Sequence, residues 1–234
     1  MRPDAITTIF IRRILSVAET GKPEWDPGAV YIYSDDNRFS PPRRQVTVSI
    51  GFTESGNLRK MLESYASKGG EKSDKFINYL PNMGRKDKST LAGDRDFIGL
   101  LKEAGKDPKM REAQEESFDT LYLGPAFDWA DKNGFEKPLS YLVIADSYLH
   151  SGSMLPFLMN SFPDKKPVDG GDEQKWIKAY LDARRKWLAN HSNKILNGTV
   201  YRADSFLREI AKGDWDLDVS SVVMHGTEVN RGVA

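Results

Sequence analysis

Three carboxylates in the first part of the chain have the chemistry of an acid–base pair. Glu19 falls on the last turn of a segment with helical periodicity, and Asp35 and Asp36 follow in a polar stretch. Glycoside hydrolysis needs a protonated carboxyl group near the leaving oxygen and a second carboxylate on the other side of the sugar ring. Glu19, which follows the apolar Val17 and Ala18, could supply the acid. Asp36, in a polar loop, would stay ionised and activate a water as the base.

Each of these carboxylates also has an ordinary structural interpretation. A glutamate at the end of a helix is commonly just an exposed side chain. The run Asp35-Asp36-Asn37 consists of residue types that favour turns. An inverting enzyme would need about 6.5–9.5 Å between its two carboxyl groups. The spacing in the sequence therefore indicates an enzyme only weakly.

The elements that would position these carboxylates are a helix and a hairpin. A helix is predicted between Asp4, which can cap it, and Gly21, which suits a left-handed C-terminal residue. Its buried face is predicted at spacings of three and four, from Ile6, Phe10, Ile14 and Val17. Segments 29–34 and 44–52 are rich in Val, Ile and Tyr and predict an antiparallel hairpin with a long polar tip.

The remainder of the chain is predicted to be helical. The segment 138–150 is apolar on nearly all sides, which is typical of a buried central helix. Loops are expected at 82–94 and 161–171, and an irregular tail from 214. The other predicted helices are 58–65, 74–80, 94–104, 108–118, 121–133, 172–190 and 201–211. The expected fold is mainly α with a small β-hairpin sheet, in one catalytic domain of two lobes. The hairpin-bearing minor lobe covers about 20–80, with a substrate cleft between the lobes.

The composition limits the possible partners. The 234 residues suit one large domain, and 34 Lys and Arg balance 34 Asp and Glu. We therefore expect neither nucleic acid nor membrane as a partner, and no run approaches the roughly 18 apolar residues of a membrane span. There are no cysteines, and the three histidines lack metal-ligand spacing. We expect no metal, no cofactor and a monomer.

An ordered set of segments resembles the family 46 chitosanases, which belong to the wider lysozyme-like group. The set covers residues from about 5 to 220. Its members are Ala18-Glu19 with Trp25 six residues later, Tyr31-Ile32, Asp36-Asn37-Arg38 where the family shows Asp-Gly-Arg, Ile50-Gly51-Phe52, Ala113-Gln114 through Leu121-Tyr122, and Gly170-Gly171-Asp172-Glu173 running into Tyr180-Leu181-Asp182-Ala183-Arg184-Arg185.

The resemblance implies a two-lobed lysozyme-like α+β fold and endo-hydrolysis of β-1,4 bonds in chitosan or a related amino-sugar polymer, with inversion. It makes Glu19 the general acid and Asp36 the general base, with Asp35 in reserve. It also implies an ion-pair network that holds the base loop. Arginine suits such a network because its planar fork can bind a carboxylate through two hydrogen bonds. The predicted members are Arg38, Arg184 and Arg202.

The chain departs from the family pattern around the hairpin. The family's Gly-Arg-Gly-Tyr-Thr run is interrupted by 39–44, which leaves its water-holding threonine without a direct counterpart, and Thr47 is the candidate for that role. Asn57 stands where the family has an aspartate that binds the substrate's ammonium group. Loss of that charge favours N-acetylated sugar. A peptidoglycan-cleaving muramidase is therefore an alternative, and an inactive glycan-binding relative is another.

The remaining candidates for substrate binding are aromatic side chains near the hairpin and one histidine. Tyr31 and its neighbours Trp25 and Tyr33 either stack on sugars or belong to the core. His150 either lines the cleft or is a core histidine with a satisfied hydrogen bond. The segment 1–6 has no secretory signal, although we expect the protein to act outside the cell or on the cell wall.

Overall fold

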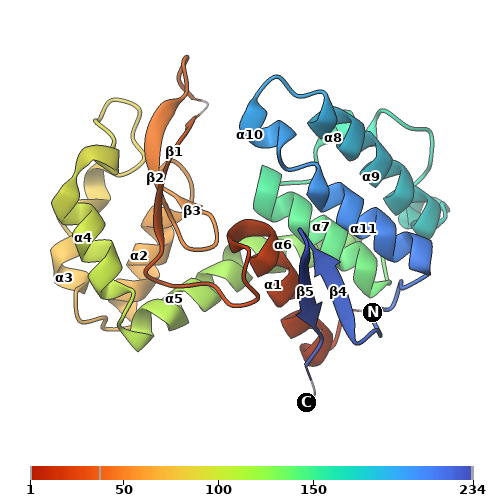
Figure 1. The fold of residues 1–234 in the computed structure, drawn as a ribbon, viewed down its shortest axis with the longest axis horizontal. Helices are drawn as coiled ribbons and strands as arrows, with labels where there is room; N and C mark the ends of the chain where they lie inside the picture. The colour runs from red at the N-terminus through yellow and green to blue at the C-terminus, as the bar shows by residue number, and fades with distance from the viewer. Residues whose placement is uncertain (1, 37, 233–234) are drawn as a thin grey trace. The chain divides into compact units, whose positions relative to one another are not determined.

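A computed structural model describes residues 2–36 and 38–232. Over these ranges the protein is mainly α-helical with two small antiparallel sheets, so the predicted helical class is confirmed (Figure 1). Asn37, part of the segment that resembles the family's Asp-Gly-Arg, lies outside the described residues. Within those residues, no helix has the length and apolar character needed to cross a membrane.

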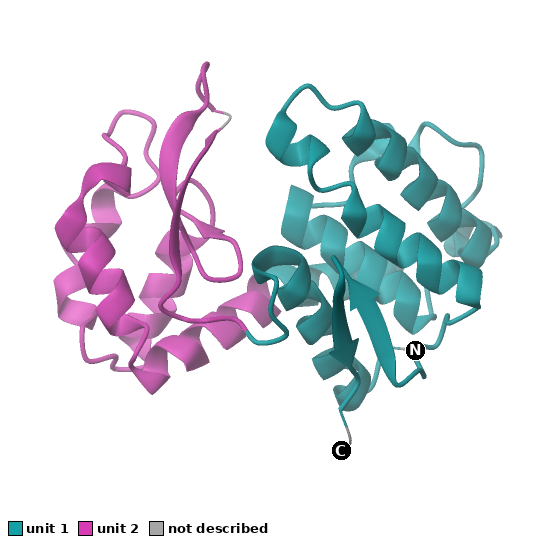
Figure 2. Ribbon diagram, viewed as in Figure 1, with its two compact units in different colours: residues 1–24, 122–234 teal, residues 25–121 magenta. Residues whose placement is uncertain are grey.

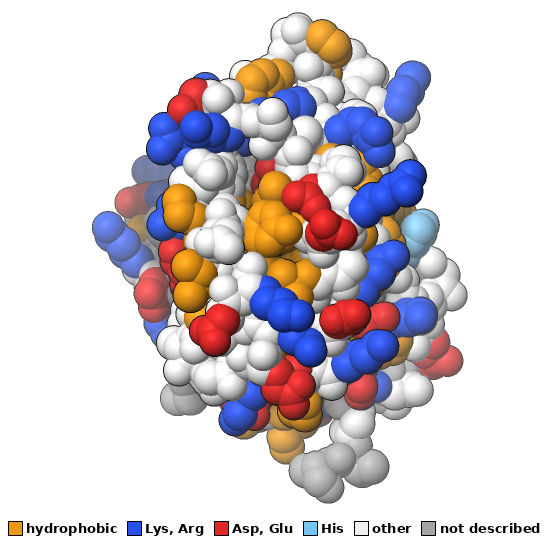
Figure 3. All heavy atoms as spheres, turned by 90° about the vertical axis from the view of Figure 1, so that its left-hand side faces the viewer, with side chains coloured by type: hydrophobic (Ala, Val, Ile, Leu, Met, Phe, Trp, Pro, Cys, Tyr) orange, Lys and Arg blue, Asp and Glu red, His pale blue; other side chains and the backbone are white. Residues whose placement is uncertain are grey.

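The chain divides into two compact units (Figure 2). Unit 1 consists of 1–24 and 122–234, and unit 2 of 25–121. The unit that carries the hairpin therefore runs beyond the range of about 20–80 predicted for the minor lobe. Figure 3 faces the side of the molecule with α3 and α4, and there cationic and anionic side chains are interspersed.

Unit 2 is built on a three-stranded antiparallel sheet in the order β1-β2-β3. Its strands are β1 (Val30–Asp36), β2 (Arg43–Val48) and β3 (Phe52–Thr53). The helices and helical turns that follow are α2 (Leu58–Ser67), α3 (Ser73–Phe76), η1 (Leu80–Asn82), η2 (Leu91–Gly93), α4 (Arg95–Ala104) and α5 (Pro108–Phe118). The predicted hairpin is confirmed, but its connection is shorter than expected and the third strand was missed.

The register of this sheet determines where the aspartates lie. Val30 pairs with Val48 and Tyr31 with Thr47, but the register shifts between Ser34 and Asp36. This β-bulge adds a residue to β1. Both aspartates therefore belong to the strand, and the prediction that Asp36 lies in a polar loop is wrong.

Unit 1 is mostly helical. Its helices and helical turns are α1 (Ala5–Thr20), α6 (Gly124–Lys132), α7 (Pro138–Ser151), α8 (Pro156–Met159), η4 (Pro167–Asp169), α9 (Glu173–Ala189), α10 (Lys194–Asn197) and α11 (Tyr201–Lys212). A π-helical turn, η3 (Asp119–Leu123), contains the division between the units at 121 and precedes α6. Helix α7 is buried from Leu139 through Ser147, as predicted for the central helix. Since its sequence is apolar on almost every side, burial of the whole helix removes the most hydrocarbon from water.

Helix α1 ends as its sequence predicts. The Asp4 side chain accepts a hydrogen bond from the Thr7 amide at 2.7 Å, and Gly21 has φ 76°. Phe10, Ile14 and Val17 are buried, but Ile6 is 39% exposed and was wrongly assigned to the core. The buried face is wide and includes Ile11 and Leu15, and a helical turn of 3.6 residues leaves position 6 at its edge.

The tail forms a hairpin that was not predicted. Strands β4 (Ser221–Met224) and β5 (Thr227–Asn230) pair antiparallel. Their alternate residues Val222, Met224 and Val229 are buried. The turn residues His225 and Gly226 both have positive φ, at 51° and 79°, as a two-residue hairpin turn requires.

Candidate active site

Glu19 lies on the last turn of α1 and its side chain is 20% exposed. Its Oε1 accepts a hydrogen bond from Nη1 of Arg202 at 2.7 Å. The carbonyl of Ala18 accepts from the Tyr201 hydroxyl at 2.6 Å and from the same Arg202 Nη1 at 3.2 Å. Two side chains at the start of α11 therefore hold the end of α1 that carries the predicted acid.

Behind Glu19, charges alternate through the interior of unit 1. Arg202 donates from Nε and Nη2 to Oδ1 of Asp146, at 2.9 and 2.6 Å. Nη1 of Arg184 donates to the other oxygen of Asp146 at 2.6 Å. All three side chains are fully or almost fully buried. We call Glu19, Arg202, Asp146 and Arg184 the acid network.

Each charge of the acid network has an opposite charge beside it. Burial alone would raise the pKa of Asp146, but Arg202 and Arg184 outweigh it and lower that pKa to about 2. Burial would also lower the pKa of Arg202, but Asp146 and Glu19 raise it overall. Sequence reasoning missed Asp146, whose signal was an acidic residue in the apolar segment 138–150.

The three predicted network arginines do not all belong to this cluster. Arg184 and Arg202 share Asp146, a partner that the resemblance did not name. Arg38 belongs to unit 2, where it binds Asp36.

His150 lies on the last turn of α7 and is half-buried. Burial, with smaller contributions from Arg202 and Arg184, lowers its pKa to about 2. Its Nδ1 lies 3.4 Å from the Ser151 hydroxyl. The imidazole is therefore neutral near pH 7, and it can accept one hydrogen bond and donate another.

Asp36 is 1% exposed and lies between two guanidinium groups. Arg38 binds it as a fork, with Nε to Oδ1 at 2.7 Å and Nη2 to Oδ2 at 2.9 Å. Arg43 donates from Nη2 to Oδ2 at 3.1 Å. The Arg38 hydrogen bonds lower the pKa of Asp36, although burial opposes them. Asp36 is ionised, as predicted, but because of arginines rather than a polar loop.

Asp35, the neighbouring residue, has a different environment. It is half-buried, and its Oδ1 accepts from Nε2 of Gln45 at 2.7 Å. The amide oxygen of Gln45 in turn accepts from the Ser55 amide at 2.9 Å. Asp35 is thus positioned by neutral groups and keeps more contact with solvent than Asp36.

The other predicted residues of unit 2 lie on the sheet and at the start of α2. Tyr31 and Tyr33 are 38% and 46% exposed, and their rings stack at 5.9 Å. Thr47 is buried opposite Tyr31, and no residue in the described ranges is a hydrogen-bond partner for its hydroxyl. Asn57 is half-buried at the N-cap of α2, where its side chain makes no capping bond among the described residues. Trp25, in contrast, is buried against Phe118.

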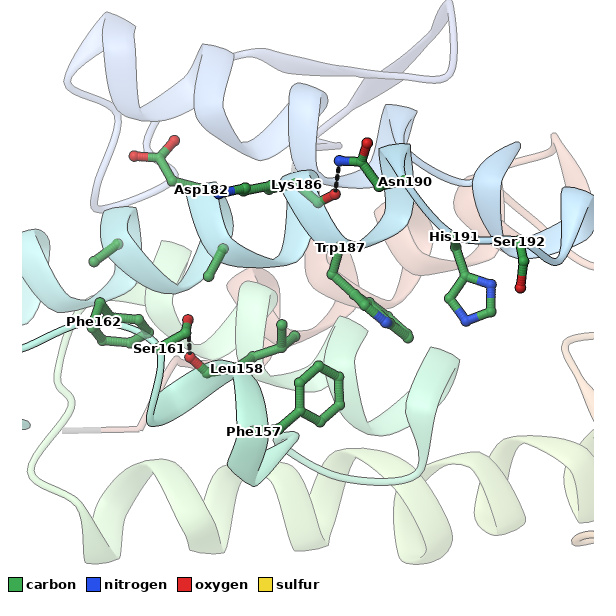
Figure 4. A pocket seen from close by; sticks show the side chains of 12 residues that line it. Phe157, Leu158, Ser161, Phe162, Asp182, Lys186, Trp187, Asn190, His191 and Ser192 are labelled. Atoms are coloured by element: carbon green, nitrogen blue, oxygen red, sulfur yellow. Dashed lines mark hydrogen bonds between the residues drawn. The ribbon is translucent and has the colours of Figure 1, made fainter.

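A groove of roughly 1040 Å³ lies elsewhere in unit 1, along α8 and α9. Figure 4 shows Phe157, Trp187 and His191 side by side on one flank of it. None of the predicted catalytic residues lines this groove. Within the described parts of the chain, His, Asp and Glu side chains form no group of three or more that could hold a metal ion.

The chain belongs to glycosyl hydrolase family 46, whose model matches residues 13–220. It is therefore a glycoside hydrolase, and the predicted family is confirmed. It is 28% identical over 218 residues to a chitosanase of Bacillus subtilis (strain 168), covering 86% of this chain and 75% of that protein. It is 24% identical over 220 residues to a chitosanase of Streptomyces sp. (strain N174), covering 88% and 74% respectively.

Solved structures support the fold. The native chitosanase of Bacillus subtilis MY002 superposes with a TM-score of 0.81 at 23% identity, covering 96% of this chain and 97% of that one. A family 46 chitosanase of Gynuella sunshinyii in complex with chitotetraose gives a TM-score of 0.80 at 19% identity and covers all of both chains. The predicted lysozyme-like α+β fold class is confirmed.

Proposed function

We propose that the protein is an endo-chitosanase that cleaves internal β-1,4 bonds with inversion, with Glu19 as general acid and Asp36 as general base. Both curated relatives are named chitosanases, and one of the similar structures holds chitotetraose. The observation that carries the residue assignment is the contrast between the two carboxylates. Glu19 is partly exposed and held at one oxygen by Arg202, whereas Asp36 is kept ionised by Arg38 and Arg43.

In the proposed reaction, Glu19 gives its proton to the glycosidic oxygen as the bond from that oxygen to the anomeric carbon breaks. The oxygen of a water forms the new bond to the anomeric carbon from the opposite face. Asp36 takes a proton from that water. The configuration at the anomeric carbon is therefore inverted, and no covalent sugar–enzyme intermediate forms. The separation of about 6.5–9.5 Å between the two carboxyl groups stays a prediction.

Asp35 is the alternative base. A base must contact the water that it activates, and Asp35 is the more exposed of the two aspartates. Asp36 has the position that matches the family motif and a lowered pKa, which favours the ionised form that a base requires. We assign the base to Asp36 on these two grounds.

The function is tested by measuring release of reducing ends from chitosan, from partly acetylated chitosan and from purified cell wall. Cleavage of chitosan is expected, and proton NMR of the first product should show the inverted anomer. Release from cell wall alone would identify a muramidase. Binding of soluble oligosaccharide without any cleavage would identify a glycan-binding relative.

Two further properties belong to this proposal. Asn57 carries no charge to pair with an ammonium group, so partly acetylated chitosan should be cleaved at least as well as fully deacetylated polymer. The protein is expected to act outside the cell or on the cell wall, because a polysaccharide such as chitosan is too large to enter a cell. Immunoblots of culture medium and cell fractions test the location.

A further inference from the structure

Arg43 makes three contacts from the start of β2. Its Nη2 donates to Oδ2 of Asp36 at 3.1 Å, and its Nη1 donates to the carbonyl of Lys88 at 2.7 Å. The guanidinium also lies over the Phe39 ring, 4.1 Å from its centroid. The Arg43 side chain is 19% exposed, so these contacts replace most of its hydration. A guanidinium held from three sides has little freedom to turn away from the carboxylate.

The sheet register brings these two residues together. Asp36 and Arg43 are direct cross-strand partners. Side chains of such partners lie close enough for an ion pair. The neighbouring Arg44 pairs with Ser34 and is exposed to solvent. Two consecutive arginines in one strand therefore differ in their relation to Asp36, because successive side chains point to opposite faces.

Arg38 makes a parallel connection on the other side of the carboxylate. While its fork holds Asp36, its Nη1 donates to the carbonyl of Gly84 at 2.6 Å. The two arginines thus tie one carboxylate to both ends of the segment 84–88. Glu54, which is buried, binds Thr90 and the Leu91 amide just beyond this segment. The Asp36 carboxylate is therefore connected through the two arginines to the backbone at Gly84 and Lys88.

We propose that Arg43 is a positioning residue, which fixes Oδ2 of the base Asp36 and fastens it to the segment 84–88. This inference rests on the proposed function. Arg43 lies in 39–44, the stretch that interrupts the family's sequence pattern, so the resemblance assigns it no role. Arg38 alone leaves Oδ2 with one donor, and Arg43 supplies the second donor that restricts rotation of the carboxylate.

The test compares Arg43→Gln with Arg44→Gln, two variants that remove the same charge from adjacent positions. For Arg43→Gln we expect kcat on soluble chitosan to fall about tenfold to a hundredfold, because small displacements of a reacting group are costly. KM should stay near its original value, and the acidic limb of the kcat–pH profile should move to higher pH. Arg44→Gln should match the wild type. Arg43→Lys should recover part of the rate, since it restores the charge but only one contact.

Three outcomes would overturn the inference. One is an unchanged kcat–pH profile in Arg43→Gln. Another is an equal shift in Arg44→Gln, which would mean a general effect of charge. The third comes from unfolding by denaturant. If the two side chains are in contact, the effects of Arg43→Gln and Asp36→Asn on the unfolding free energy should be strongly non-additive, and additive effects would contradict the contact. This last measurement does not need activity, so it tests the Arg43–Asp36 contact even if no polymer is cleaved. Absence of cleavage by the wild type would instead contradict the proposed function.

Discussion

The Nη1 atom of Arg202 lies 2.7 Å from Oε1 of Glu19 and joins the proposed acid to a buried cluster of charges. Arg202 itself is 2% exposed, and its Nε and Nη2 atoms donate to Asp146. The position of the Glu19 carboxyl group is thus set from inside unit 1, through α11 and α7. Substitutions in this cluster should affect both stability and catalysis, and substitutions of Glu19 mainly catalysis.

Glu19→Gln should lower the rate of chitosan cleavage by several orders of magnitude, because an amide cannot donate a proton to the leaving oxygen as a carboxylic acid does. The amide keeps the shape of the side chain, so folding should be retained. Reducing-end assays check this result. Glu24→Gln is the control, since Glu24 is an exposed glutamate of the same unit. Near-normal turnover of Glu19→Gln would rule out Glu19 as the acid.

The two adjacent aspartates should respond differently to the same change. Asp36→Asn should reduce kcat about 10²–10⁴-fold, as expected for loss of a general base. Asp35→Asn should have a mild effect, since its Oδ1 is held by the neutral amide of Gln45. The measurement is kcat and KM on chitosan at several pH values. The opposite pattern would transfer the role of base to Asp35.

Asp146→Ala should destabilise the protein by about 3–5 kcal/mol, because it leaves the buried guanidinium groups of Arg184 and Arg202 without their counter-ion. Denaturant unfolding measures this free energy. Asp182→Ala is the control, since Asp182 forms an exposed ion pair with Lys178 worth about 0–1 kcal/mol. Equal losses in the two variants would contradict the role of Asp146 in the acid network.

The stability of the protein should fall as the solution becomes acidic, partly because of His150. The pKa of His150 is about 2 in the folded protein, whereas an unfolded histidine titrates near pH 6.5. Between these values the unfolded chain binds a proton that the folded protein does not, so stability is lost as pH falls below about 6.5. His150 contributes at most about 1.4 kcal/mol per pH unit to the slope of the unfolding free energy against pH.

His150→Gln removes this titration and should flatten the pH dependence of the unfolding free energy between about pH 4.5 and 6.5. Asp146 contributes at lower pH, because its pKa of about 2 lies below the value of about 3.9 for an unfolded aspartate. That contribution is present above pH 4 and is lost as pH falls toward 2. Identical slopes for the wild type and His150→Gln above pH 4.5 would exclude His150 as the source.

Local sequence signals predicted most of the fold. The Asp4 cap and Gly21 located the ends of α1, and the apolar segment 138–150 predicted the buried helix α7. These features depend on neighbouring residues, which is why they can be read from the sequence. The β4–β5 hairpin also had a local signal, in alternating apolar residues around His225-Gly226, but its strands are short and the pattern is weak.

The surroundings of the candidate residues could not be predicted in the same way. Contacts such as Arg202 with Asp146 join residues far apart in the sequence, and periodicity within one element contains no information about them. The resemblance supplied Arg184 and Arg202 but not Asp146. The pairing of Arg43 with Asp36 depends on a single register shift, and a sequence pattern cannot locate such a shift.

The bulge between Ser34 and Asp36 also makes two chemically identical neighbours unequal. If the pairing continued beyond Ser34 without the bulge, strict alternation would place Asp35 opposite Arg43 and turn the side chain of Asp36 to the other face. The strand would still pair, and both aspartates would still be present. Loss of the bulge would therefore exchange their environments rather than remove a carboxylate. In this protein the aspartate that the two arginines bind is selected by a register shift as much as by the residue type.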